Sequence, residues 1–165
     1  MYNSLPQLNI INKECIMHKI ALIATAVAAM AAAPAYAAGE GRIEARGGIA
    51  FANGDSEAIA GIGGGYDFDL GKSGFIGLDL GADKLLVGGT KVVFSTGARV
   101  GGRVGEKTKL YANAGIGFCC GTSDFYAGAG VQQKFGEKLY GKLEYRRILG
   151  GSDVNSVQVG RGFAF

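Results

Sequence analysis

After residue 37, apolar and polar side chains alternate along the chain with a period of two residues, which is typical of β-strands. Turn signals divide this part of the chain into eight alternating runs, each close to the roughly 10 residues of a transmembrane strand. The predicted strands are Arg42–Asn53, Glu57–Leu70, Gly74–Lys84, Lys91–Gly105, Thr108–Cys119, Asp124–Gly136, Leu139–Leu149 and Val154–Phe165. Short charged turns that recur at Gly71, Gly105 and Gly136 fall at one end of the predicted hairpins. The pattern therefore predicts an all-β fold, an eight-stranded antiparallel up-and-down barrel.

One face of the predicted strands is apolar, and the other carries the charged residues. In the fifth run, for example, Leu110 and Ala112 alternate with Lys109 and Asn113. A soluble barrel would bury the apolar face, whereas a membrane barrel turns it towards lipid. The aromatic residues of the apolar face gather near the strand ends, as two membrane–water interfaces require. The two groups are Phe51, Phe94, Phe118, Phe125 and Tyr145 at the loop side, and Tyr66, Phe68, Phe135, Phe163 and Phe165 at the short-turn side. The apolar face is therefore predicted to face lipid, as in a transmembrane β-barrel.

The first 37 residues differ in composition from the rest, because all 30 glycines follow Ala37. A short positive segment at Met17–Lys19, an apolar run over residues 20–33 and the Ala35–Ala37 cleavage pattern are typical of a secretory signal peptide. The sequence predicts a leader over residues 1–37, with Met17 as the true start, and a barrel domain over residues 38–165. A retained signal anchor is the alternative.

Two segments near the carboxyl end carry a family resemblance: Leu143-Glu144-Tyr145-Arg146-Arg147, and the terminal Val159–Phe165, which ends on an aromatic residue. Together with the leader and the glycine-rich strands, they resemble the small outer-membrane barrels of the opacity-type, OmpA-like family. The resemblance implies a place in the lipid of the bacterial outer membrane, reached through the periplasm, and we expect the barrel to be a monomer. It also implies that the barrel-assembly machinery recognises Phe163 and Phe165. The short loops depart from the family and argue against adhesion or receptor roles.

The predicted inward face carries nearly balanced charge. Its members are Arg42, Glu44, Arg46, Glu57, Asp67, Asp69, Asp79, Asp83, Arg99, Arg103, Lys109, Lys134, Lys142, Glu144 and Arg146. Eight strands leave a lumen just wide enough for side chains, and a charge withdrawn from water needs a partner. The set therefore predicts a network of ion pairs that plugs the lumen of an envelope structural or surface protein. The alternatives are a narrow porin-like channel for small solutes and a soluble periplasmic binding barrel.

Candidate chemistry is sparse in this sequence. The single histidine, His18, lies in the predicted leader, so the barrel domain has no Ser/His or Cys/His pair and no histidine ligand for a metal. The domain holds 15 Lys and Arg against 13 Asp and Glu, a balance that argues against nucleic-acid binding. The sequence predicts a protein that is not an enzyme and uses no cofactor.

Three smaller features leave alternatives open. Cys119 and Cys120 form either a vicinal disulfide, which an oxidising compartment allows, or two small residues at a strand end. Lys84 and Arg147, outward near the loop side, either contact phosphates of the outer-leaflet glycolipid or extend to water. Arg161 points outward by strict alternation, unless a bulge in the last strand turns it inward.

Overall fold

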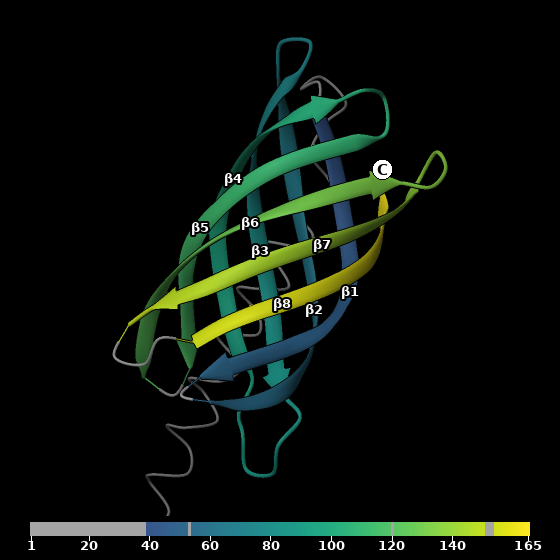
Figure 1. Ribbon diagram of the computed structural model, residues 1–165. Helices are drawn as coiled ribbons and strands as arrows, with labels where there is room; N and C mark the ends of the chain where they lie inside the picture. Colours follow the sequence, from purple (N-terminus) through teal and green to yellow (C-terminus); the bar gives the residue numbers. More distant parts are fainter. Residues whose placement is uncertain (1–38, 53, 120, 151–153) are drawn as a thin grey trace, which may run out of the picture. The chain divides into compact units, whose positions relative to one another are not determined.

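The computed structural model is a closed barrel of eight antiparallel strands, in which each strand pairs with its neighbours in the chain and β8 pairs with β1 (Figure 1). The structure describes residues 39–52, 54–119, 121–150 and 154–165. The strands are β1 (Gly39–Ala52), β2 (Asp55–Leu70), β3 (Gly74–Leu85), β4 (Val93–Val104), β5 (Thr108–Cys119), β6 (Thr122–Lys134), β7 (Leu139–Leu149) and β8 (Val154–Ala164). The predicted fold class and the order of the strands are confirmed.

Short turns join the strands at one end of the barrel. Gly71 and Gly105 lie in two of these turns with φ of 69° and 76°, a left-handed conformation that glycine adopts without steric cost. The connection between β3 and β4, residues 86–92, is the longest one at the opposite end, which is called the loop side below. In outer-membrane barrels the short turns face the periplasm and the loops face outward.

The seam that closes the barrel begins earlier than the sequence pattern indicates. The predicted first strand starts at Arg42, whereas β1 starts at Gly39. The amide of Gly41 donates to the carbonyl of Phe165 at 2.7 Å, and the Phe165 amide donates back to Gly41 at 2.8 Å. Pairing with the chain end therefore extends β1 and brings Glu40 into the barrel wall.

The apolar face of every strand points outward, as predicted. Leu110 is 50% exposed and Val159 58% exposed, while Lys109 and Gln158 beside them are buried. The outward aromatics include Phe125 near the loop side, which is 63% exposed, whereas Tyr66 at the short-turn side is covered and its ring lies 4.8 Å from that of Phe68.

Two further predictions concern a bulge in the last strand and a leader before the barrel. The proposed bulge in β8 is wrong, because Arg161 pairs in unbroken register with Ala45 of β1 and Gly141 of β7 and points outward. The predicted leader and the predicted start at Met17 lie outside the described residues. Within the described ranges, no helix is long and apolar enough to cross a membrane.

Candidate functional site

Many of the inward charged side chains contact each other across a glycine on the strand between them. In five cross-strand rows, two hydrogen-bonding side chains on strands two apart flank a glycine on the strand between them. The rows are Arg42–Gly65–Asp79, Arg46–Gly61–Asp83, Asp67–Gly77–Arg99, Glu44–Gly162–Tyr140 and Tyr111–Gly130–Glu144. Adjacent strands lie about 4.8 Å apart, so strands two apart are within reach of long side chains when nothing fills the row between them. Because the inward glycines have no side chain, they leave the space in which these ion pairs and hydrogen bonds form.

Asp67 is the centre of the first cluster. Its carboxylate accepts two hydrogen bonds from the Arg99 guanidinium, at 2.7 and 2.5 Å, and one from Lys109 at 2.9 Å. Arg42 lies 3.6 Å from the same carboxylate and forms a further ion pair with Asp79. Asp67 and Arg99 are 0% and 1% exposed, so this pair is withdrawn from solvent inside the barrel.

Glu144 and Glu44 form a second cluster across the β7–β8–β1 seam. Lys142 joins their two carboxylates, at 2.5 Å from Glu44 and 3.2 Å from Glu144. The Tyr140 hydroxyl donates to Glu44 and the Tyr111 hydroxyl to Glu144, each at 2.8 Å. Lys142 therefore holds the carboxylates of Glu44 and Glu144 together across the seam that closes the barrel, and each carboxylate also accepts a hydrogen bond from a tyrosine.

A third group links β1, β3 and β7 across the lumen. Arg46 donates two hydrogen bonds of 2.7 Å to Asp83, and Arg146 lies 3.7 Å from the same carboxylate while it pairs with Glu144 at 2.7 Å. The Arg146 guanidinium also lies 4.4 Å from the centre of the Tyr126 ring, within the range of a cation–π contact. Side chains from opposite walls thus meet in the interior.

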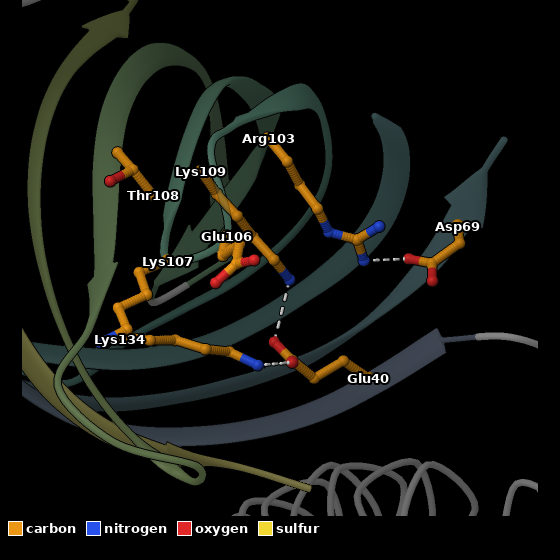
Figure 2. A pocket seen from close by; sticks show the side chains of 8 residues that line it. All are labelled: Glu40, Asp69, Arg103, Glu106, Lys107, Thr108, Lys109 and Lys134. Carbon is orange, nitrogen blue, oxygen red and sulfur yellow. Dashed lines mark hydrogen bonds and ion pairs between the residues drawn. The ribbon is translucent and has the colours of Figure 1, made fainter. Parts of the chain in front are cut away.

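The short-turn end of the barrel opens into a polar cavity of about 360 Å³ (Figure 2). Lys109 and Lys134 both reach Glu40, and Arg103 reaches Asp69 across the mouth. Beneath this cavity, the same Lys109 ammonium bonds the buried Asp67. The charges at the mouth are therefore continuous with the closed network in the interior.

The structure places all fifteen predicted lumen residues on inward positions of the strands, although Glu57, near the loop-side end of β2, is exposed. Asp67 pairs with Arg99 and Asp69 with Arg103, although these partners lie on β2 and β4, with β3 between them. The row at Gly77 explains the contact between Asp67 and Arg99, because a glycine leaves the intervening position open.

Sequence reasoning missed several members of the site. Glu40 lies outside the predicted first strand, which begins at Arg42, whereas β1 begins at Gly39. Tyr111, Tyr126, Tyr140 and Phe75 fill the interior, and their exposed fractions are 5% or less. Each lies an even number of residues from an inward charge on its own strand, so parity with the charged positions could have found them.

The remaining predicted positions lie away from the lumen network or outside the description. Lys84 and Arg147 are exposed on the outward face near the loop side. Cys119 ends β5 at a partly exposed position. Cys120, and with it the vicinal disulfide, lies outside the described residues. Among the residues that are described, no cluster of His, Cys, Asp and Glu has the arrangement of a metal site.

Solved structures of outer-membrane proteins share this architecture. The comparison with curated proteins finds no match. Among solved structures, Ail of Yersinia pestis is 16% identical, with 77% of this chain and 98% of that chain covered and a TM-score of 0.58. The N-terminal barrel of Pseudomonas aeruginosa OprF is 21% identical (76% and 97% covered, TM-score 0.56). The outer membrane enzyme PagL is 18% identical (73% and 97% covered, TM-score 0.51). At these identities the likeness establishes the fold.

A match to a family model identifies the family of this chain. The model described as the outer membrane protein beta-barrel domain matches residues 22–165. This match and the exposed apolar belt show that the third alternative, a soluble periplasmic binding barrel, is wrong. The chain belongs to the outer membrane β-barrel domain family and is a protein of the bacterial outer membrane.

Proposed function

We propose that this protein is a non-catalytic, monomeric barrel with a structural or surface role in the envelope, and that ion pairs plug its lumen. The observation that carries the proposal is the Asp67–Arg99 pair, which is bidentate, withdrawn from solvent and joined through Lys109 to the cluster at the mouth. A route for solutes would have to break hydrogen-bonded charges that have no water to replace their partners.

The non-catalytic part of the proposal rests on how the carboxylates are held. Asp67, Asp83 and Glu144 each contact at least two cationic side chains, so none is poised to accept a proton from a substrate. PagL shows that the same fold can carry an enzyme, but the fold alone does not transfer an activity.

A narrow channel is the second candidate, and two observations favour it. The mouth cavity of about 360 Å³ leads towards the interior. In addition, Gln132 and Gln158 each keep a buried side-chain atom without a hydrogen-bond partner among the described residues. Buried polar atoms of this kind are satisfied when water enters. A water-filled path would supply them with partners.

Planar-bilayer recording separates the two candidates. For the plugged barrel we expect no steady, discrete conductance from refolded protein, because Asp67 and Arg99 stay paired across the interior. Heat-modifiable migration in a gel provides the control that the protein added to the bilayer is folded. Steady steps from the folded wild type would establish the channel and end the plugged-lumen proposal.

We further propose that Phe163 and Phe165 form the signal that the barrel-assembly machinery reads. Both rings lie on the outward face, 57% and 58% exposed, on the strand that closes the barrel. Exposed rings on the closing strand are accessible to a partner before lipid covers them.

Substitution of Phe165 tests this assignment. We expect Phe165→Ala to reduce the amount of folded barrel in outer-membrane fractions severalfold while refolding in detergent stays efficient. Phe68→Ala is the matched control, since it removes an outward aromatic from the same belt on another strand and should assemble normally. Equal losses for both variants would assign the effect to the aromatic belt in general.

The outer-membrane lipid is the remaining proposed partner. Lys84 and Arg147 lie outward near the loop side, where phosphates of the outer-leaflet glycolipid are within reach of their side chains. We propose that they contact these phosphates; the experiment given below for Arg161 includes a variant of this pair.

A further inference from the structure

Arg161 is a cation on the lipid-facing surface of a membrane-spanning strand. Pairing fixes its orientation from both sides, because it lies opposite Ala45 of β1 and Gly141 of β7 in unbroken register. Its outward neighbours along β8 are Val159 and Phe163, both well exposed. Facing hydrocarbon, an arginine costs from about 0–1 kcal/mol near an interface to about 2–4 kcal/mol at the midplane. A partner in the membrane would offset this cost.

The partner does not come from the described part of this chain. No described side chain forms an ion pair or hydrogen bond with the Arg161 guanidinium, and the residue does not belong to the lumen network. The outward positions of the described strands carry three charged side chains, Lys84, Arg147 and Arg161, and no Asp or Glu. The outward strand face of a second copy would therefore offer no anion to Arg161 either. The charge of this surface is complementary to anionic lipid headgroups.

The depth of Arg161 brings a headgroup within reach. The residue lies one outward step above Phe163 and two above Phe165, which belong to the short-turn aromatic belt. One outward step is two residues, or about 7 Å along a strand, and less in depth because the strands are tilted. A long arginine side chain spans such a distance by extending towards the interface.

The immediate surroundings leave room for a headgroup. Gly141 and Ala45 flank Arg161 in its row, and neither of these residues has a large side chain of its own. Phe135 reaches from the β6–β7 turn over Gly141, where its Cε2 atom would lie 2.8 Å from an added Cβ. The small residues of this row therefore leave space beside Arg161, bordered by Phe135 and, on the same strand, by Phe163.

We propose that Arg161 binds the phosphate of a phospholipid in the periplasmic leaflet, as a lipid site beyond the envelope role proposed above. The short turns face the periplasm, so the headgroups nearest to Phe163 and Phe165 belong to that leaflet. A guanidinium donates two parallel hydrogen bonds to a phosphate, a geometry that the ammonium of lysine lacks. This contact anchors the closing strand to the membrane at a fixed depth.

Solid-state NMR measures the contact directly. The full barrel, with its arginine side chains labelled with ¹⁵N, is folded into vesicles of dioleoylphosphatidylglycerol, and dephasing of the guanidinium signals by lipid ³¹P is recorded. The Arg147→Gln background leaves Arg161 as the one arginine on the described outward positions, and the buried lumen arginines serve as internal controls. We expect dephasing in this background and its loss in Arg147→Gln/Arg161→Gln. No dephasing while Arg161 is present would overturn the proposal.

Stability provides a second measurement that depends on the phosphate. We expect Arg161→Leu to raise the unfolding equilibrium constant about tenfold in phosphatidylglycerol, the effect of one lost charge-assisted hydrogen bond. Arg161→Lys should show a smaller rise. In vesicles of phosphate-free digalactosyldiacylglycerol, Arg161→Leu should show no rise. The same rise in both lipids would assign Arg161 a role within the protein and overturn the lipid site.

Two further outcomes identify a different partner. If the wild-type midpoint depends on the protein-to-lipid ratio and Arg161→Leu removes this dependence, the partner is a second copy of the chain. If Arg161→Leu reduces the glycolipid that co-purifies from native outer membranes, the phosphate belongs to the outer leaflet. We expect that reduction for Lys84→Gln/Arg147→Gln and not for Arg161→Leu.

Discussion

Replacing Asp67 by asparagine is expected to lower the free energy of unfolding by about 3–5 kcal/mol, the cost of breaking a buried ion pair by removing one partner. Asparagine keeps the size of the side chain but removes the charge that Arg99, Arg42 and Lys109 share. Arg99 would stay in the interior without an anionic partner, while Arg42 and Lys109 would keep only their ion pairs with Asp79 and Glu40. Urea unfolding of the barrel in phospholipid vesicles measures the change.

Asp69→Asn is the matched control for this measurement. Asp69 lies two residues further along the same strand and pairs with Arg103, but the two side chains are 25% and 27% exposed at the mouth. Water compensates such a pair, so its removal is expected to cost only about 0–1 kcal/mol. Equal effects of the two substitutions would show that the interior is hydrated and would favour the channel.

Replacing Gly77 by alanine is expected to lower the free energy of unfolding by about 1–3 kcal/mol, the usual cost of forcing additional volume into a packed interior. A Cβ at this position would collide with Asp67 Oδ1 and would lie 2.9 Å from the Tyr66 carbonyl oxygen and 3.3 Å from Arg99 Cγ. The methyl group therefore occupies the space through which the Asp67–Arg99 pair forms. The same urea titration in vesicles measures this change.

Gly47→Ala controls for the intrinsic effect of replacing a strand glycine. Gly47 points outward on β1, and the nearest atom to an added Cβ is the Ile59 carbonyl oxygen at 3.6 Å, an ordinary contact. A methyl group facing lipid is expected to leave stability unchanged or to raise it slightly. If Gly47→Ala were as harmful as Gly77→Ala, the cost would arise from the backbone and the row arrangement would not explain the glycines.

Strand alternation was sufficient to predict most of the architecture. Because side chains on a strand alternate between two faces, the position of Lys109 also fixes where Leu110 points, and the lipid-facing surface follows. The same parity assigned Arg161 to the outside, and the unbroken register of β8 agrees. The start of β1 could not be predicted in this way, since it depends on pairing between Gly41 and Phe165 at opposite ends of the barrel domain.

The sequence by itself determined that this protein is an eight-stranded barrel with an apolar outside and a charged inside, because the period of two is a local property of each strand. Only the tertiary structure decided which charges meet. Closure of the barrel sets the register between strands, and that register places a glycine between Asp67 and Arg99, and between Arg42 and Asp79. Partners on strands two apart are not encoded in any local pattern, so the network exists only once the sheet has closed.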